Sequence, residues 1–191
     1  IFECSKRAAS IIPLLQRAVD RGDIRARINA VWALTQITGL ADPSVAEARS
    51  AAGRSTAERT AEARSTAAAR SAAQSVIRRA LNDRDVRVRH VAARSLATYP
   101  DPAALPRLLE LLAADEPPVR REAAKSLGRL NDPSAVPALL TALTHSADRD
   151  EEHALIYALI ELNASQETTV GLAADSAAVR RGALIALDQM P

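Results

Sequence analysis

The strongest constraint on this chain is an internal repeat within residues 83–143. VRHVAARSL starts at Val88 and VRREAAKSL starts at Val119, an offset of 31 residues. The Asp-Pro pairs at 101–102 and 132–133 keep that offset. A repeat in this length range with helical patterning is typical of a solenoid, in which each unit stacks on its neighbours. The repeat therefore predicts an all-α chain of stacked helical pairs.

The composition indicates a thin, helical core. Of 191 residues, 48% are hydrophobic, but only four are aromatic and many of the rest are alanine. Alanine and leucine favour helices, whereas sheets draw on β-branched and aromatic residues. The single cysteine, Cys4, excludes an internal disulfide or a cysteine-based zinc site. No apolar run approaches the roughly 20 residues of a membrane span.

Five second helices share one apolar register. Their anchoring leucines are Leu34, Leu96, Leu127, Leu159 and Leu187, at steps of 62, 31, 32 and 28 residues. The first step is twice a normal repeat. The predicted apolar stripes are 26/30/34/37, 88/92/96/99, 119/123/127/130, 155/159/162 and 179/183/187/190. Pro13 is expected in the first turn of the first helix, where its missing N–H costs nothing.

Residues 46–75 fill the double step and contain no apolar side chain larger than alanine. We interpret them as a degenerate Ala/Arg/Ser-rich repeat or an insertion, helical but thinly packed, with Gly53 as a plausible break. A basic arm for nucleic acid is the alternative. Interleaved glutamates and the lack of an aromatic side chain for base stacking count against it.

Acidic residues stand just before each second helix, where they can cap free N–H groups. They are Asp23, Asp85, Asp115, Asp148 and Asp175. Arginine follows at positions 27, 89, 120 and 180, which predicts a ladder of surface ion pairs between neighbouring repeats. Glu151 and Glu152 break the pattern; adjacent on a helix, they are expected to diverge as part of a capping turn.

The segment VRREAAKSLGRLNDPSAVPALLTAL, residues 119–143, resembles the short HEAT-like repeats also found in phycobilin lyases. The resemblance is strong over 83–143, weak over 46–75, and extends over residues 8–191. It implies one right-handed alpha-alpha solenoid over residues 1–191, with about five to six helical pairs whose second helices line the concave face.

A looser similarity involves NAVWALTQI (29–37), EHALIYALIEL (152–162) and AVRRGALIALDQM (178–190). These segments resemble the HEAT segment of large bacterial polypeptides that join a propeller, HEAT repeats and a c-type cytochrome. The resemblance would place the chain outside the cytoplasm. Because the sequence starts at Ile1 without methionine, we expect it to be an excerpt of a longer chain.

No constellation of residues predicts chemistry. His90 and His153 occupy the repeat slot of Arg121 and Arg181, which is a solvent-facing slot. The acidic and histidine residues within 145–153 lack a recognised metal-ligand spacing. There is no nucleophile elbow and no glycine-rich phosphate loop. We therefore expect no catalytic, cofactor-binding or metal-binding residue, and no cofactor.

The exposed face of the second helices carries the candidate site. The exposed positions of this face place basic residues between two aromatic residues. Aromatic residues and arginine are the types that interface hot spots favour. The candidate partner-binding residues are Trp32, His90, Arg94, Arg121, Lys125, Arg129 and Tyr157. The alternative, without a binding role, is that the aromatic residues pack on neighbouring helices and the basic residues are only solvated.

The sequence thus predicts a non-enzymatic protein-interaction or scaffold module. Its partner would be another protein, or another domain of the parent chain, with an acidic or mixed surface. One alternative is a nucleic-acid binder like the HEAT-like DNA glycosylases, which a net charge of only +2 disfavours. The other is a bilin-lyase-like enzyme, which only the repeat type supports.

Overall fold

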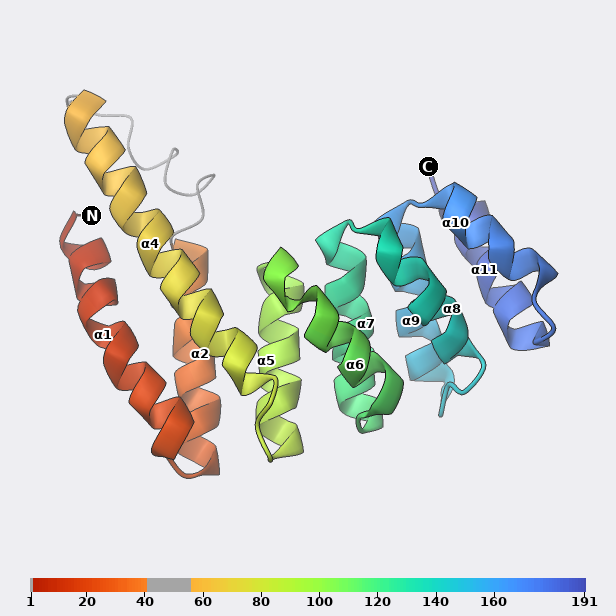
Figure 1. Ribbon diagram of the computed structural model, residues 1–191, viewed down its shortest axis with the longest axis horizontal. Helices are drawn as coiled ribbons and strands as arrows, with labels where there is room; N and C mark the ends of the chain where they lie inside the picture. The colour runs from red at the N-terminus through yellow and green to blue at the C-terminus, as the bar shows by residue number, and fades with distance from the viewer. Residues whose placement is uncertain (1, 41–55) are drawn as a thin grey trace. The chain divides into compact units, whose positions relative to one another are not determined.

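The computed structural model describes residues 2–40 and 56–191, and every element within these ranges is a helix (Figure 1). The prediction of an all-α solenoid of helical pairs is confirmed. The chain forms two compact units, Ile1–Ser95 and Leu96–Pro191. No helix among the described residues is long and apolar enough to cross a membrane.

Unit 1 contains α1 (Phe2–Arg21), α2 (Ile24–Leu40), α4 (Thr56–Ala80) and most of α5 (Val86–Thr98). Helix α4 packs against both α1 and α2. Pro13 lies inside α1 and not in its first turn. The prediction for Pro13 was wrong because the helix begins at Phe2, well before the apolar pattern that marked its start.

The Ala-rich segment 46–75 falls partly on residues 41–55, which lie outside the described part together with Gly53. From Thr56 the chain is one continuous helix, α4. Among the α4 residues whose side chains the structure describes, the buried ones are Ala69, Ala73, Val76, Ile77 and Ala80. The assignment of 46–75 as a degenerate repeat or an insertion stays a prediction.

Helices α2 and α5 are direct neighbours although their anchoring leucines stand 62 residues apart. The hydroxyl groups of Thr35 and Ser95 share a buried hydrogen bond of 2.6 Å. The guanidinium of Arg27 lies 3.5 Å from the Asp83 carboxylate, and both side chains are buried. The double step in the sequence therefore separates two second helices that touch.

Unit 2 is built from three helical pairs, each a first helix followed by a second helix (Figure 1). The pairs are α6 (Leu105–Ala114) with α7 (Pro117–Leu130), α8 (Val136–Leu143) with α9 (Arg149–Leu162), and α10 (Ser165–Thr169) plus η3 (Val170–Ala173) with α11 (Ala177–Gln189). Short 3-10 turns, η1 (Pro102–Ala104) and η2 (Pro133–Ala135), lead into α6 and α8.

The Asp-Pro repeat of the sequence makes the turns between pairs. The Asp101 carboxylate accepts a hydrogen bond of 3.2 Å from the Ala103 N–H, and the Asp132 carboxylate accepts one of 3.0 Å from the Ser134 N–H. Hydrogen bonds from Ser134 lower the pKa of Asp132. Asn131, with φ 55°, ends α7 in the left-handed region, a conformation that asparagine tolerates better than most residues.

The predicted apolar register is confirmed by burial at the central positions of the stripes, whereas positions at helix ends such as Ile37, Tyr99 and Leu130 are half-buried. Leu34, Leu127 and Leu159 have no exposed surface, and Leu96 has 1%. Leu187, the last anchor, is only half-buried. Helices α7 and α9 approach closely at Gly128, where an added Cβ would lie 2.8 Å from the Ala158 Cα. Small residues at the contact let the leucine stripes of successive pairs meet.

The capping prediction holds for three of the five aspartates. Asp23, Asp85 and Asp148 accept hydrogen bonds from N–H groups in the first turns of α2, α5 and α9. Asp115 and Asp175 do not cap a helix. The N-cap positions of α7 and α11 are Glu116 and Ser176, without a side-chain cap. Both helices therefore begin one residue later than the aspartate positions predict.

We expect Leu127→Ala to lower the free energy of unfolding by about 2–5 kcal/mol, because it leaves a cavity at a fully buried anchor. Urea unfolding followed by circular dichroism measures the change. Ile185→Ala removes a branched side chain from a second helix at a position that is 41% exposed, and should cost about 0.5 kcal/mol or less. Equal losses in both variants would contradict the stacked core.

Candidate functional site

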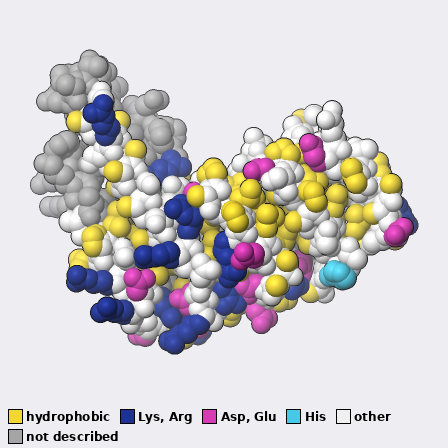
Figure 2. Space-filling model, viewed as in Figure 1, with side chains coloured by type: hydrophobic (Ala, Val, Ile, Leu, Met, Phe, Trp, Pro, Cys, Tyr) yellow, Lys and Arg dark blue, Asp and Glu magenta, His cyan; other side chains and the backbone are white. Residues whose placement is uncertain are grey.

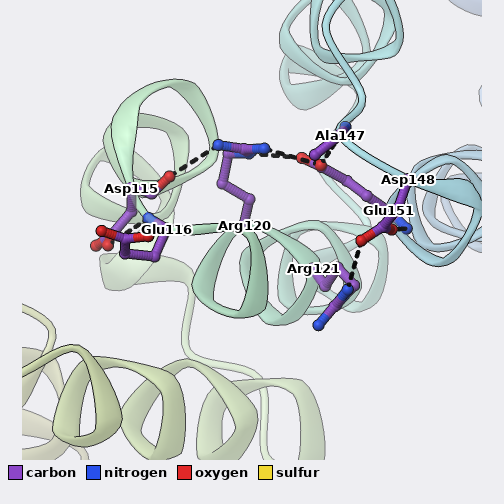
Figure 3. Close-up of polar contacts among 7 residues, drawn as sticks. All are labelled: Asp115, Glu116, Arg120, Arg121, Ala147, Asp148 and Glu151. Carbon is purple, nitrogen blue, oxygen red and sulfur yellow. Dashed lines mark hydrogen bonds and ion pairs between the residues drawn. The ribbon is translucent and has the colours of Figure 1, made fainter.

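A buried ion pair joins the second helices α7 and α9 of unit 2 (Figure 3). Arg120 Nε donates to Glu151 Oε1 at 2.5 Å, and Arg120 Nη2 donates to Glu151 Oε2 at 2.8 Å. Glu151 Oε2 also accepts from the Ala147 N–H at 2.8 Å. The Glu151 side chain is 1% exposed and that of Arg120 is 20% exposed. This bidentate geometry fixes α9 and its leading loop to α7.

Burial raises the pKa of Glu151, but hydrogen bonds from Arg120 and from the Ala147 N–H, together with the charge of Arg120, outweigh it. The net effect is a lowered pKa. The hydrogen bonds to Glu151 raise the pKa of Arg120 in turn. Both groups are therefore charged at neutral pH, and their charges cancel.

The arginine that recurs near the start of second helices binds its own loop. Arg89 Nη1 donates to the Asp83 carbonyl at 2.9 Å, and Arg120 Nη1 donates to the Asp115 carbonyl at 2.9 Å. Arg180 Nη1 donates to the Ala174 carbonyl at 2.7 Å. The predicted ladder of ion pairs between repeats is thus corrected at Arg89, Arg120 and Arg180, whereas arginine–aspartate pairs between neighbouring repeats do form at Arg27–Asp83 and Arg121–Asp148. The first three arginines hold carbonyl groups of the preceding turn, and the pair that links neighbouring repeats at Arg120 uses the buried Glu151.

The unit 2 face is the exposed side of α7, α9 and α11. Its residues are Arg121, Lys125, Arg129, His153, Tyr157, Glu161, Arg181 and Ile185. All four cations have a carboxylate partner within 4 Å. The pairs are Arg121–Asp148 at 3.2 Å, Lys125–Glu122 at 2.8 Å, Arg129–Glu161 at 3.4 Å and Arg181–Glu152 at 2.5 Å. The unit 2 face is therefore electrically mixed rather than basic.

An aromatic pair stands between these ion pairs on α9. The rings of His153 and Tyr157 are stacked, with centroids 6.4 Å apart and an interplanar angle of 7°. Both residues are exposed, Tyr157 by 45%. Glu161, one turn further along α9, receives Arg129 from α7. The structure thus brings two predicted residues, Arg129 and Tyr157, onto adjoining helices.

The unit 1 face is the exposed side of α2 and α5. Trp32 on α2 is 60% exposed. On α5, Arg94 is exposed and His90 is half-buried. The contact between Thr35 and Ser95 joins the two helices one turn after Trp32 and next to Arg94. Trp32 therefore does not pack into the core of unit 1.

The opposite side of unit 2 carries an open groove of about 380 Å³ between the first helices α6 and α8. Leu109, Leu112, Pro137, Ala138 and Ala142 line it, with the Arg120–Glu151 pair below and His145 at the side. Figure 2 shows hydrophobic side chains gathered over α6 and α8. Arg120 and Glu151 in the lining bond each other.

The structure provides no metal-binding cluster within the described ranges. His145, Asp148, Asp150 and His153 come from a loop and a helix start, and Asp148 is engaged by Arg121 and by the Glu151 N–H. Glu151 and Glu152 diverge as predicted, the first to Arg120 and the second to Arg181. Asp148, Glu151 and Glu152 therefore form contacts that join α9 to its neighbours and to its own first turn.

Fold and faces together define a helical repeat protein with an exposed aromatic side chain on each of the two faces. Residues 73–160 match the family described as HEAT repeats, which confirms the predicted HEAT-like recognition over this segment. No curated protein matches the chain significantly. The further resemblance to propeller, HEAT and cytochrome polypeptides stays a prediction.

Several solved structures are similar in fold. A designed armadillo repeat protein is 15% identical with a TM-score of 0.44, covering 94% of this chain and 100% of its own. Another, in complex with the peptide (KR)4, is 16% identical with a TM-score of 0.47, over 94% and 99%. The complex of CpcE and CpcF of phycocyanin lyase from Nostoc sp. PCC7120 is 21% identical with a TM-score of 0.45, over 91% and 74%.

Sequence reasoning missed the role of Glu151. The residue occupies the register position that Val119 and Val179 fill in the neighbouring second helices, and both valines are buried. A carboxylate at an apolar position signals a buried ion pair. The sequence contained that signal, but the adjacent Glu152 made the two glutamates resemble an acidic helix cap.

We expect Glu151→Gln to destabilise unit 2 by about 3 kcal/mol, because it leaves the Arg120 charge without its counter-ion in a largely buried site. Glu152→Gln is a matched control at the next position. Glu152 pairs with Arg181, which is 61% exposed, so the loss should stay below about 1 kcal/mol. Urea midpoints of the two variants provide the comparison, and similar midpoints would contradict the structural role of Arg120–Glu151.

The same pair predicts a pH dependence. A carboxyl group whose folded-state pKa is lowered adds stability that is present above its unfolded pKa and is lost as pH falls through the folded pKa. Glu151 has a lowered pKa. The stability gap between the unmodified chain and Glu151→Gln should therefore be largest at pH 7 and shrink below about pH 4.3, the usual glutamate range. Urea unfolding at several pH values measures the gap, and a constant gap would contradict the assignment.

Proposed function

We propose that the chain is a non-enzymatic protein-binding module that contacts its partner through the unit 1 and unit 2 faces. The observation that carries the proposal is the exposure of Trp32 and Tyr157, 60% and 45%, in a chain with four aromatic residues. Exposed tryptophan and tyrosine on rigid elements are typical of interface hot spots, since they bury much area at little entropic cost.

The paired charges define the kind of partner. Arg121, Lys125 and Arg129 each face a carboxylate of this chain, so the surface offers alternating signs rather than a positive field. A partner with both acidic and basic side chains around an apolar centre matches this surface. Nucleic acid is a poorer match, because phosphate binding needs unneutralised cations.

Among the described residues the two aromatic side chains lie in different units, and each face is proposed on its own observations. Trp32 lies on α2, and Arg94 and His90 lie on α5, which the Thr35–Ser95 hydrogen bond joins to α2. Tyr157 stands beside His153 and the Arg129–Glu161 pair. A partner that engages only one face would be sensitive to only one of the two aromatic substitutions.

We expect Trp32→Ala or Tyr157→Ala to weaken partner binding at least about tenfold, equivalent to about 1.4 kcal/mol. Proteins that co-purify with the chain from its source cells are identified by mass spectrometry, purified and titrated calorimetrically. His145→Ala is the matched control, an exposed ring on the groove side of unit 2. Full affinity in both aromatic variants would overturn the proposal.

A charge-reversal variant provides a second arm of this experiment. Replacing Arg94, Arg121, Lys125 and Arg129 by glutamate should abolish partner capture while helical content is retained. At the last three positions glutamate would face an acidic neighbour, which reverses the local charge pattern. Unchanged capture would exclude these cations from the interface.

A further inference from the structure

The four ion pairs of the unit 2 face balance in charge, but their partners are not equally exposed. In three of the pairs the cation side chain is more exposed than its carboxylate partner. These pairs are Lys125 at 45% with Glu122 at 12%, Arg129 at 49% with Glu161 at 21%, and Arg181 at 61% with Glu152 at 22%. Only Arg121, at 28% beside Asp148 at 48%, has the opposite order. Most carboxylates of this face therefore lie below their cations.

Glu161 and Glu122 show how these carboxylates are held. Glu161 Oε1 lies 3.4 Å from Arg129 Nε, whereas its Oε2 is buried and receives no hydrogen bond from a described group. Glu122 Oε1 lies 2.8 Å from Lys125 Nζ, one turn further along α7. A group that approaches from solvent meets the cations first. Because Coulomb energy falls with distance, the nearer cation outweighs the deeper carboxylate at contact.

The repeat register places these cations around an apolar centre. Lys125 on α7, Tyr157 on α9 and Ile185 on α11 each stand two residues before the anchoring leucine of their helix. Helices α7 and α11 both pack against α9. Tyr157 and Ile185, 45% and 41% exposed, therefore form the centre of the unit 2 face. Lys125 lies on one side of this centre, and Arg181 lies one turn before Ile185.

The other charges of the three helices add no net charge to this face. Arg120 and Glu151 form the buried pair. The remaining charged residues are exposed and comprise two of each sign, namely Arg149 and Asp150 at the start of α9 and Arg180 and Asp188 on α11. The unit 2 face therefore has no positive field that would act beyond a Debye length of about 8 Å. Its selection among charged partners takes place at contact.

We propose that the unit 2 face binds a protein segment in which carboxylates flank a large apolar side chain. The apolar side chain covers Tyr157 and Ile185, and the carboxylates bond Lys125 and Arg181 on either side. The charges then match across the contact, while the apolar centre excludes water. A nucleic-acid strand fits less well, because its binding depends on cations that are not already neutralised. The inference rests on the proposed function and adds the charge order of the partner to it.

A random peptide library displayed on phage tests this charge order without a known partner. The library is selected on the full chain, and sequences that also bind Tyr157→Ala are removed. Tyr157 is 45% exposed, so this variant should keep its fold, which circular dichroism checks. The remaining sequences should carry aspartate or glutamate on both sides of an aliphatic or aromatic residue. As synthetic peptides they should bind Tyr157→Ala at least about tenfold more weakly than the unmodified chain.

Two substitutions within one ion pair should change the affinity in opposite directions. Lys125→Gln removes the outer cation and should weaken binding of a selected peptide about threefold, whereas Glu122→Gln releases Lys125 and should strengthen binding by a similar factor. Arg149→Gln removes an exposed cation at the start of α9. As the matched control, it should leave the affinity unchanged. Isothermal titration calorimetry measures the affinities, and circular dichroism checks that each variant is folded.

The proposal is overturned if the Tyr157-dependent sequences are basic or uncharged, or if the library contains no such sequence. It is also overturned if both substitutions in the Lys125–Glu122 pair leave the affinity of the folded chain unchanged or shift it the other way, or if a single-stranded oligonucleotide binds more tightly than the peptides. Basic Tyr157-dependent sequences would leave protein binding by the unit 2 face intact. Full partner affinity in both Trp32→Ala and Tyr157→Ala would instead remove the proposed function itself.

Discussion

The structure depends on close stacking of each second helix on the next. A core built from alanine and leucine, with four aromatic residues in the whole chain, gives each helical pair only a thin apolar stripe. One pair cannot bury that stripe alone. The contact of Gly128 with Ala158, and the approach of Gly182 to Leu143 of α8, bring successive pairs of unit 2 close enough for dispersion contacts to add up.

Periodicity in the sequence predicted this stacking well, because burial in a solenoid follows the repeat. Leu127 and Leu159 are buried as their register requires. Details set by local geometry were harder to predict. Asp115 stands where an N-cap is expected, but the chain turns one residue later, at Glu116. Pro13 is a helix-start signal in general, yet α1 extends before it. These outcomes depend on backbone geometry that residue types do not specify.

The candidate faces were predictable in position but not in charge. The slots that contain Arg121 and Arg129 could be read from the repeat, and both side chains lie where the register places them. Their partners, Asp148 and Glu161, come from the following second helix and its N-cap. Such ion pairs between repeats depend on the rotation from one helical pair to the next. The period of the sequence does not specify that rotation. Pairing changes the surface from basic to mixed.

In a repeat protein, the burial of a side chain depends on the adjoining repeat as much as on the residue type. Leu127 on α7, which packs against α9, is fully buried, whereas Leu187 at the same register position on α11 is half-buried. Arg120 and Glu151 show the same dependence for polar groups, since each is satisfied only by the adjoining repeat. Surfaces that stack and surfaces that bind partners therefore differ in kind. The surfaces between repeats follow the repeated register, whereas the exposed faces of the second helices vary from repeat to repeat and can carry specificity.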